Sequence, residues 1–483
     1  MGWGHKKLSQ NRSGWEWSRV VASPEKCYYI GPLSVPMDQA KERTIRPASA
    51  GLDDRQDIIV RIFPVEREED GTGISMECVG DATGEIEVDI LRSADSTDSG
   101  MVRRIVNKAV GECRLSGVRI EVLDQGAEAF VIRARTLAAC HRASIDGRGG
   151  QVDQLGFQGE VRDSIDNDGT DGSGCERPED RLRRSRIYIP GNRPRMIAKA
   201  EGFGADVIIL DLEDSVPPSE KDSARFLVAE ALLHRNFGSA ERMVRINPLS
   251  TCGAEDIAAI IPSGPDAIVL PKCEEPRDIH DIERLINEIH CMEDSQRGEM
   301  SDAIPTLILP LIETARGVMN AHAIAACSPR VIGLSFGGED FSRDIGAERT
   351  VAGEELFLAR SMLVLAAKAA GKQALDTIFA DVKDTEGLRR DAARMRKLGF
   401  NGKGAIHPAQ IPVIHEVYSP SRKELQHAVD VVAAARMAEL QGSGIAVLKG
   451  KMIDVPVIKR AEKVIAIAER IGLEVPVSSE PNE

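Results

Sequence analysis

Acidic residues stand at the ends of short apolar segments in the second half of the chain. Glu313 ends the segment TLILPLIE, and Asp340 ends the segment VIGLSFGGED. If these segments are neighbouring parallel strands, the two carboxylates meet at the same edge of the sheet. Carboxylate oxygens suit Mg²⁺, which keeps waters and substrate oxygens among its ligands. The pattern predicts a magnesium site at Glu313 and Asp340. The alternative is that each acid caps the helix that follows it.

A buried arginine is the second candidate for chemistry. Arg245 lies within the apolar segment MVRIN, while Asp211 and Asp214 end the segment VIILDLED. A guanidinium inside a strand needs an anionic partner. That partner is either Asp211 or Asp214, in a structural ion pair, or the carboxylate or thioester enolate of a substrate. The pattern leaves both interpretations open.

Three further strand ends carry residues with more than one interpretation. Lys272 follows the segment AIVLP and admits a rival chemistry, a Schiff base with a carbonyl substrate; its alternative is a solvated lysine. His407, at the end of the last predicted strand, is more typical of a hydrogen-bonded core histidine than of a ligand. Gly337 and Gly338 either let the backbone approach a ligand or form a turn.

Eight short apolar segments alternate with helical patterns after residue 183. The predicted strands are 187–190, 207–212, 243–247, 267–271, 306–313, 331–336, 374–378 and 404–407. Near-continuous apolar strands with crossover helices predict a parallel sheet, and eight such units fit a closed barrel of about 250 residues. An open doubly wound sheet is the alternative, but no G-x-G-x-x-G follows the first strand. The predicted fold is α/β, a (β/α)8 TIM barrel over residues 181–440, with a C-terminal helical extension over 441–483.

The first third of the chain predicts separate units. Residues 46–142 predict a small α+β domain, with strands at 57–63, 84–91, 118–123 and 129–134 and a helix at 101–113. Residues 143–180 are rich in Gly, Asp and Ser, which predicts a flexible linker. Residues 1–45 have no clear period and predict a poorly ordered extension, with a docking arm as the alternative.

Composition narrows the class of protein. The 483 residues contain 62 Lys and Arg against 76 Asp and Glu, a net charge of −14, which disfavours a general nucleic-acid binder. No run of 18 apolar residues occurs and the first residues lack a signal-peptide core, so we expect no membrane span or secretion signal. The 9 cysteines are scattered without a C-x-x-C, which argues against a zinc ribbon or disulfide scaffold and for a reducing, cytoplasmic setting.

Nine ordered segments carry a family resemblance over about residues 183–473. They are RRSRIYIPGNRPRM, DVIILDLEDSVPPSEKDSAR, MVRINPL, AIVLPKCE, LILPLIETARGV, IGLSFGGEDF, ALDTIFADVKD, LGFNGKGAIHPAQI and LKGKMIDVPVI. This part resembles the citrate lyase beta subunits (citryl-CoA lyases) of the HpcH/HpaI aldolase family, which also contains citramalyl- and malyl-CoA lyases.

The resemblance implies Mg²⁺-dependent cleavage of a 3-hydroxyacyl thioester, of the citryl-CoA or citryl-carrier type, to oxaloacetate and an acetyl thioester. It implies a homo-oligomer and, as a partner, a citrate lyase alpha subunit. It implies these roles: Glu313 and Asp340 as metal ligands; Arg245, Glu313 and Asp454 as catalytic residues; Arg245, Glu313, Asp211, Asp214 and Gly338 as substrate contacts. In the family, the aspartate that matches Asp454 reaches a neighbouring subunit's site. A citramalyl-CoA or malyl-CoA lyase, or a catalytically silent scaffold or regulatory subunit, remains an alternative.

The small domain carries a second resemblance. AGLDDRQDIIVRIFP and VRIEVLDQGAEAFVIRARTLAA resemble the citrate lyase gamma subunit, an acyl carrier protein. In that family, a serine carries a phosphoribosyl-dephospho-CoA arm, but here Arg55 occupies the matching position, and Ser49 is out of register. A guanidinium cannot form the phosphodiester. We therefore expect that the domain has lost its carrier role; the alternative is that another serine serves.

Overall fold

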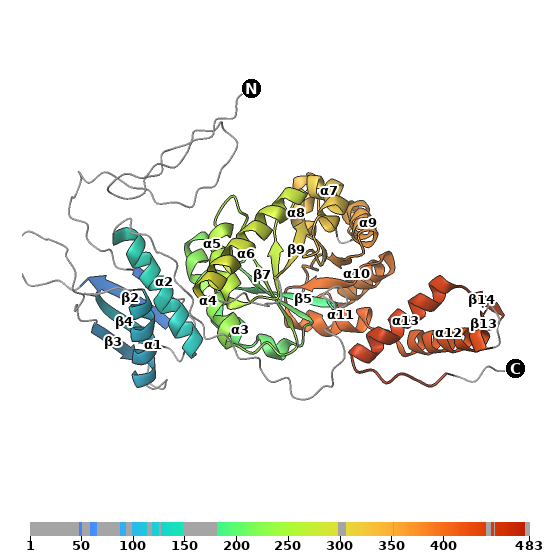
Figure 1. The fold of residues 1–483 in the computed structure, drawn as a ribbon, viewed down its shortest axis with the longest axis horizontal. Coiled ribbons are helices and arrows are strands. Elements are labelled where there is room, and N and C mark those ends of the chain that lie inside the picture. Colours follow the sequence, from blue (N-terminus) through green and yellow to red (C-terminus); the bar gives the residue numbers. More distant parts are fainter. Residues whose placement is uncertain are drawn as a thin grey trace, which may run out of the picture.

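The computed structural model describes two domains and a C-terminal arm (Figure 1). The described residues are 48–50, 58–64, 87–92, 99–113, 118–124, 127–147, 181–297, 306–350, 352–440, 446–448 and 450–478. The predicted extension over 1–45, Arg55 and most of the predicted linker lie outside these residues.

The small domain is a four-stranded sheet with two helices. Its strands are β1 (Ala48–Ala50), β2 (Ile58–Pro64), β3 (Glu87–Arg92) and β4 (Val118–Asp124), in the order β1-β2-β4-β3. Strands β3 and β4 are parallel, and α1 (Ser99–Glu112) connects them, whereas the other neighbours are antiparallel. The predicted α+β architecture is therefore observed in the described part of this domain.

The predicted strand at 129–134 is wrong, because these residues begin helix α2 (Ala129–Gly147). Their run of apolar residues shows neither helical nor strand period, since α2 is buried on more than one side. Phe130, Val131 and Ile132 are adjacent in sequence, and all three are buried. The alanines that follow favour a helix, which then continues five residues into the predicted linker.

Eight parallel strands close into a barrel, as predicted, and the open doubly wound alternative is excluded. The strands are β5 (Ser185–Pro190), β6 (Val207–Asp211), β7 (Glu241–Arg245), β8 (Ala267–Leu270), β9 (Leu307–Ile312), β10 (Gly333–Phe336), β11 (Gln373–Asp376) and β12 (Gly402–Ala405). Each strand pairs with the next, and β12 pairs with β5 to close the barrel. Buried side chains such as Val207, Ile209, Met243, Val269 and Leu309 form a core of their own within the strand set.

Helices follow the strands and cover the outside of the barrel (Figure 1). They are α3 (Pro194–Ala198), α4 (Lys221–His234), α5 (Gly253–Ile260), α6 (Pro276–Arg297), α7 (Ala315–Ala326), α8 (Gly338–Asp344), α9 (Glu354–Ala369), α10 (Thr385–Leu398) and α11 (Ile411–Tyr418), with short 3₁₀ turns that include η2 (Pro218–Glu220) and η4 (Pro408–Gln410). Local residues set their ends. The side chain of Asp384 accepts a hydrogen bond from Gly387 N at 2.8 Å and begins α10, and Gly399, with φ 118°, ends it.

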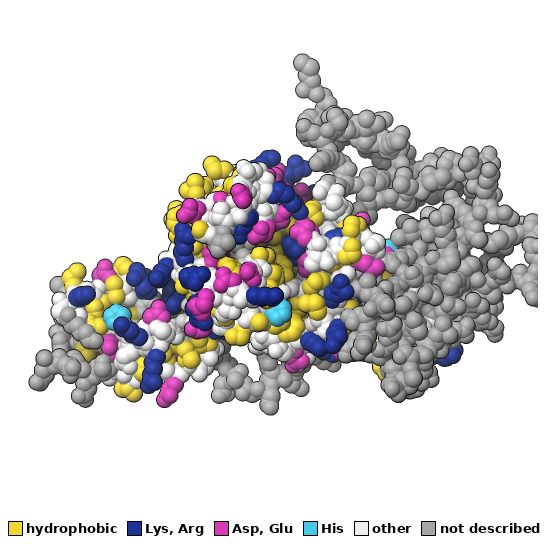
Figure 2. All heavy atoms as spheres, turned by 180° about the vertical axis from the view of Figure 1, so that it is seen from behind, with side chains coloured by type: hydrophobic (Ala, Val, Ile, Leu, Met, Phe, Trp, Pro, Cys, Tyr) yellow, Lys and Arg dark blue, Asp and Glu magenta, His cyan; other side chains and the backbone are white. Residues whose placement is uncertain are grey.

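The chain leaves the barrel in an arm built from two helices and a small hairpin. Helix α12 (Arg422–Leu440) packs against α13 (Val455–Arg470), and strands β13 (Ala446–Leu448) and β14 (Lys451–Ile453) lie between them in sequence. Figure 1 shows the arm projecting from the barrel, with the hairpin at its far tip. On the face shown in Figure 2, basic and acidic side chains are interspersed over the barrel and the arm. Among the described residues, no helix is long and apolar enough to cross a membrane.

Candidate active site

A cavity of about 460 Å³ lies at the carboxyl ends of the barrel strands. Its lining includes the predicted residues Asp211, Asp214, Arg245, Glu313, Gly338 and Asp340. These residues come from four different strand ends and the loops after them, as parallel strands in a barrel require. The structure therefore brings together all the predicted site residues except Asp454.

Arg245 is held by carboxylates on two sides. Its Nε and Nη2 donate to the two oxygens of Asp211 at 2.6 and 2.7 Å, and its Nη1 lies 2.9 Å from Glu213 Oε2. The guanidinium carbon also lies 5.2 Å from the centre of the Tyr188 ring. Burial lowers the pKa of Arg245, but its hydrogen bonds to Asp211 and the charge of Asp211 outweigh burial and raise the pKa. A guanidinium has five N–H groups, so these contacts leave one on Nη1 and one on Nη2 for a further acceptor. Arg245 thus makes the structural pair, keeps N–H groups beyond those bound to Asp211, and lines the cavity.

Asp211 organises the loop that follows β6. Its carboxylate accepts hydrogen bonds from the backbone N–H of Glu213 at 2.9 Å and of Ser215 at 3.2 Å, and from the Ser215 hydroxyl. The same oxygens bind Arg245, so Asp211 joins strand β7 to this loop. Asp214 is more exposed and lies 3.6 Å from Arg245, which leaves its carboxylate facing solvent.

Glu213 is a site residue that the sequence analysis missed. Its side chain is buried and lies 2.6 Å from Lys272 Nζ and 2.9 Å from Arg245 Nη1. Burial raises the pKa of Glu213 despite these two cations. The dense acidic run 211–214 was the sequence signal for Glu213. The hydrophobic pattern of the chain does not show which of these acidic side chains are buried.

Lys272 has an unusual backbone conformation next to the site. Its φ of 51° makes it the one non-glycine residue in the described part of the chain with positive φ. This conformation costs on the order of 1 kcal/mol for a residue with a side chain. It directs the Lys272 N–H to Glu313 Oε1 at 2.8 Å while the ammonium binds Glu213. Burial lowers the pKa of Lys272, but the hydrogen bond to Glu213 outweighs it and raises the pKa. Lys272 is therefore an ion-paired ammonium, and its side chain remains 38% exposed.

Glu313 is a buried acid without a cation partner within 4 Å among the described residues. Burial raises the pKa of Glu313, the charges of Glu213 and Asp340 raise it further, and together they bring it to about 8. Glycine is required beside it, since a Cβ on Gly337 would lie 2.6 Å from Glu313 Oε2. Close packing, burial and like charges thus meet at one carboxyl group.

Asp340 and Gly338 lie in the first turn of α8. The Asp340 carboxylate is partly exposed and lies 2.5 Å from Arg343, whose own side chain is 75% exposed. Such an exposed ion pair contributes little and yields readily to a stronger partner. The N–H of Gly338 already donates to Thr377 Oγ1 at 3.0 Å, so Gly338 offers close approach to the cavity and no spare donor.

The acid pair fits a divalent cation. Among the described residues, no group of three or more His, Cys, Asp and Glu is arranged to hold a metal by itself. Mg²⁺ commonly takes one or two carboxylates and completes its shell with waters and substrate oxygens. The raised pKa of Glu313 fits such a site, because a cation would supply the positive charge that this buried carboxyl group lacks. The residues that would hold it are Glu313 and Asp340.

Asp454 does not lie with the other predicted residues. It is the N-cap of α13, and its carboxylate accepts a hydrogen bond from Val457 N at 3.2 Å. Figure 1 places the start of α13 at the tip of the arm, away from the barrel. Asp454 therefore does not contribute to the cavity of its own chain.

Two other polar strand-end residues have structural roles. His407 is exposed and caps η4, where its Nδ1 accepts from Ala409 N at 3.1 Å, so the core position predicted for it is wrong. The apolar strand before His407 is compatible with a helix cap and with a core position, so the sequence pattern could not distinguish the two. Asp376 is fully buried between Arg360 at 2.9 Å and Lys403 at 2.6 Å, in an ion network under the helices.

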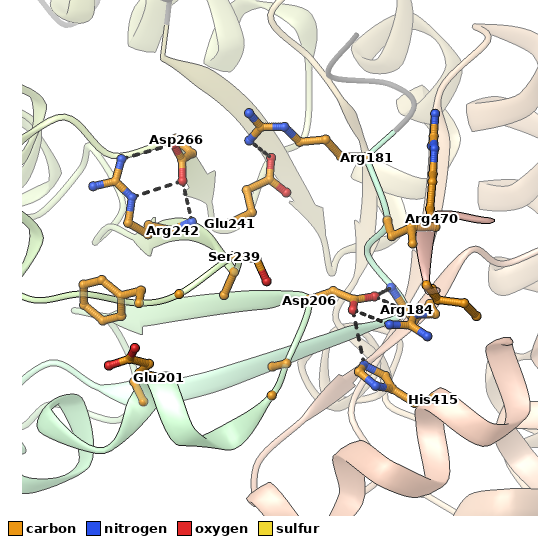
Figure 3. A pocket seen from close by; sticks show the side chains of 18 of the residues that line it. Arg181, Arg184, Glu201, Asp206, Ser239, Glu241, Arg242, Asp266, His415 and Arg470 are labelled. Carbon is orange, nitrogen blue, oxygen red and sulfur yellow. Dashed lines mark hydrogen bonds and ion pairs between the residues drawn. The ribbon is translucent and has the colours of Figure 1, made fainter. Parts of the chain in front are cut away.

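A larger cavity, of about 1070 Å³, lies at the opposite end of the barrel (Figure 3). Two of its arginines are paired with acids, Arg184 with Asp206 at 2.7 Å and Arg242 with Asp266 at 3.2 Å. Residues at the amino-terminal ends of barrel strands usually stabilise the fold and take no part in catalysis. The paired charges agree with that role.

A closed parallel barrel with acids and an arginine converging at its carboxyl end is the architecture of a (β/α)8 enzyme. The family model described as HpcH/HpaI aldolase/citrate lyase matches residues 184–408. The model described as malonate decarboxylase delta subunit (MdcD) matches residues 74–143 and is an acyl-carrier family.

Individual proteins match the same part of the chain. Citrate lyase subunit beta of Leuconostoc mesenteroides subsp. cremoris is 42% identical over 304 residues, which are 63% of this chain and 98% of that protein. The mitochondrial citramalyl-CoA lyase of Mus musculus is 33% identical over 300 residues, 60% of this chain and 87% of that protein. The structure of CitE from Mycobacterium tuberculosis in complex with magnesium, acetoacetate and coenzyme A is 31% identical, covers 60% of this chain and 99% of that one, and gives a TM-score of 0.49. The chain belongs to the HpcH/HpaI aldolase/citrate lyase family, and it carries an acyl-carrier-like domain before its lyase barrel.

Proposed function

We propose that this chain is a Mg²⁺-dependent carbon–carbon lyase that cleaves a citryl thioester to oxaloacetate and an acetyl thioester. The observation that carries the proposal is the buried Glu313, with its pKa raised to about 8, in one cavity with Asp340 and Arg245. The 42% identity to a citrate lyase beta subunit over nearly that protein's whole length supports the same activity.

The residues would divide the work as follows. Glu313 and Asp340 would hold Mg²⁺, which when bound supplies Lewis-acid polarisation of the substrate's hydroxyl and carboxylate oxygens. Arg245, oriented by Asp211, would direct its free N–H groups at a substrate carboxylate or at the enolate oxygen. Asp214 and Gly338 would shape the cavity around the substrate.

The reaction balances without a redox partner. A base removes the proton of the 3-hydroxyl group, and the bond between the carbinol carbon and the thioester's α-carbon breaks. The carbinol carbon becomes the ketone of oxaloacetate, and the electron pair remains as a thioester enolate, which takes up one proton to give the acetyl thioester. Donors fixed in advance around the developing negative charge lower the barrier.

The position of Asp454 supports a composite site. Because the arm carries Asp454 away from its own barrel, we propose that it acts in the cavity of a neighbouring copy within a homo-oligomer. A citrate lyase alpha subunit is a further proposed partner. We also propose a cytoplasmic location, because the 9 cysteines are scattered along the chain without a C-x-x-C.

The test measures release of the 2-oxo acid from citryl-CoA, citramalyl-CoA and malyl-CoA by the purified full chain. We expect cleavage of citryl-CoA that is lost with EDTA and restored by Mg²⁺. Preferential cleavage of citramalyl-CoA would instead assign the second candidate, which the 33% identity to a citramalyl-CoA lyase favours. No cleavage of any thioester would favour a silent scaffold.

The same assay separates two mechanisms. A Schiff-base aldolase needs an uncharged amine, but the pKa of Lys272 is raised by Glu213, so its ammonium stays protonated at neutral pH. We expect borohydride with substrate to leave Lys272 unmodified. A covalent adduct on Lys272 would contradict the metal mechanism.

We also propose that the substrate is a free CoA thioester and that the carrier-like domain bears no prosthetic arm. The support is Arg55 at the position of the family's modified serine. Intact-mass measurement on protein from its native host should give the unmodified mass. A phosphoribosyl-dephospho-CoA addition on Ser49, or on any serine between residues 46 and 142, would overturn this proposal.

A further inference from the structure

The carrier-like domain is seated on the barrel through helix α2, which lies along α4 (Figure 1). One apolar core continues across the junction and includes Leu137 and Ala138 of α2 with Phe226 of α4. The ring of His141 stands edge-on to Phe226 with 5.6 Å between centroids. A junction with a shared core behaves as part of the fold and not as a tether.

Ion pairs flank this core. Arg133 Nε lies 2.8 Å from Glu230, whose side chain is fully buried, and Arg235 of the barrel donates to Glu128 at 2.5 Å. These contacts lie along the later turns of α4 and just after it, far along the helix from the carboxyl end of β6. They hold the domain but touch no loop of the candidate active site.

Arg135 is different, because it reaches the active-site end of α4. Its side chain is fully buried. Nη1 donates to the Ser223 hydroxyl, Nη2 donates to the carbonyl of Asn192 at 3.4 Å, and Nη1 lies 3.9 Å from the carboxylate of Glu220. One guanidinium from the carrier-like domain thus binds both the loop after β5 and the first turn of α4.

Those two segments support the backbone of the site. The loop after β5 approaches β6 so closely that a Cβ on Gly191 would lie 2.8 Å from the carbonyl oxygen of Asp211, and Gly191 N donates to that oxygen at 2.7 Å. In the second segment, Lys221 Nζ donates to the carbonyls of Leu212 at 2.8 Å and Glu213 at 2.5 Å. Gly191 and Lys221 thus fix the backbone of residues 211–213. Arg135 binds Asn192 and Ser223, which are close to them in sequence.

We propose that Arg135, supplied by the carrier-like domain, is a positioning residue for the 211–215 loop of the lyase site. In this chain the fused domain would support the active-site loop from outside the cavity, which it does not line. The catalytic consequence rests on the proposed function, whereas the ordering of the loop does not. Removal of the guanidinium leaves the Ser223 hydroxyl and the Asn192 carbonyl buried without their donor, which the loops can relieve only by moving toward water.

The experiment compares Arg135→Met with Arg133→Met in the full chain. Both variants remove one arginine of helix α2 that contacts the barrel, but only Arg135 contacts the loop after β5 and the first turn of α4. Hydrogen–deuterium exchange of residues 211–223 is the first readout, and kcat and KM for the preferred acyl-CoA are the second. We expect Arg135→Met to speed exchange at 211–223 and to raise KM about tenfold or more, with a smaller change in kcat, because a charged hydrogen bond stabilises by about 1.5–3 kcal/mol. We expect Arg133→Met to leave both nearly unchanged.

Several outcomes would overturn the proposal. Unchanged exchange at 211–223 in folded Arg135→Met would show that the loop does not depend on this residue. Equal loosening in both variants would show that docking alone matters. If Arg135→Met does not fold, Ser223→Ala removes the acceptor from the barrel side, and it should reproduce the faster exchange in a milder form; unchanged exchange there would refute the role. If the wild-type chain cleaves no thioester, the proposed function fails, while the exchange comparison still decides this inference.

Discussion

The electrostatic cost at Glu313 is the most informative property of a single residue in this protein. A carboxyl group with a pKa near 8 is mostly neutral at neutral pH, although a metal ligand must be ionised. Burial near Glu213 and Asp340 therefore stores unfavourable free energy that a bound cation would relieve. A site of this kind would gain cation binding at the expense of stability.

Glu313→Gln tests this trade-off. The amide keeps the shape of the side chain and removes the charge, so we expect lyase activity to fall about 10³-fold or more. We expect the melting temperature in EDTA to stay the same or rise.

The pH dependence of stability shows whether Glu313 stabilises or destabilises the fold. In metal-free protein, folding raises the pKa of Glu313 from 4.5 to about 8, so the stability from this group is full below 4.5 and is lost as the pH rises toward 8. Melting curves between about pH 5 and pH 9 should show this loss in the wild type and a weaker one in Glu313→Gln. Parallel pH profiles for the two proteins would contradict the raised pKa.

Arg245→Lys tests the planar guanidinium. A lysine lacks the planar fork that binds both oxygens of Asp211 and keeps further N–H groups for a second acceptor. We expect kcat/KM to fall about 100-fold or more with the fold unchanged by circular dichroism. Near-wild-type activity would reduce Arg245 to a structural ion-pair residue.

At the scale of elements, the arm separates Asp454, for which we propose a catalytic role, from its own barrel. Asp454 caps α13, and asparagine is an equally good N-cap, so Asp454→Asn removes the charge while the helix start remains. We expect inactive but folded protein from this variant.

Mixing provides the decisive control for a shared site. Oligomers reassembled from Asp454→Asn and Glu313→Gln chains should regain activity, because some cavities would receive Glu313 from one chain and Asp454 from another. Absence of any regained activity, with mixed oligomers demonstrated by mass, would exclude a role for Asp454 in a neighbouring site.

At the scale of the whole molecule, the two domains depend on each other more than a polar linker suggests. A fragment of residues 181–483 has the complete barrel, so we expect it to fold and to form oligomers. It exposes Phe226 and the buried Glu230 of α4, so we expect a melting temperature several degrees below that of the full chain. Circular dichroism and size-exclusion chromatography measure both. An insoluble fragment would make the small domain part of the barrel's core, and an unchanged melting temperature would mean that the α2–α4 contact adds no stability.

The sequence alone determined the barrel and most of the cavity. Buried parallel strands need apolar residues along their whole length, and crossover helices need a 3.6-residue period, so the alternation of the two patterns defined all eight strands. Because parallel strands end on the same side, the positions of Arg245, Glu313 and Asp340 at strand ends were enough to place them together.

Only the tertiary structure decided the rest, for one physical reason. A periodic pattern records burial on one side of one element, whereas α2 is buried by both its own sheet and α4, so its pattern was lost and its first residues predicted a strand. The inward turn of Glu213, the positive φ of Lys272 and the contacts of Arg135 likewise depend on groups brought from distant parts of the chain. Desolvation and charge at a site are sums over everything that packs around it, and that sum exists only once the chain has folded.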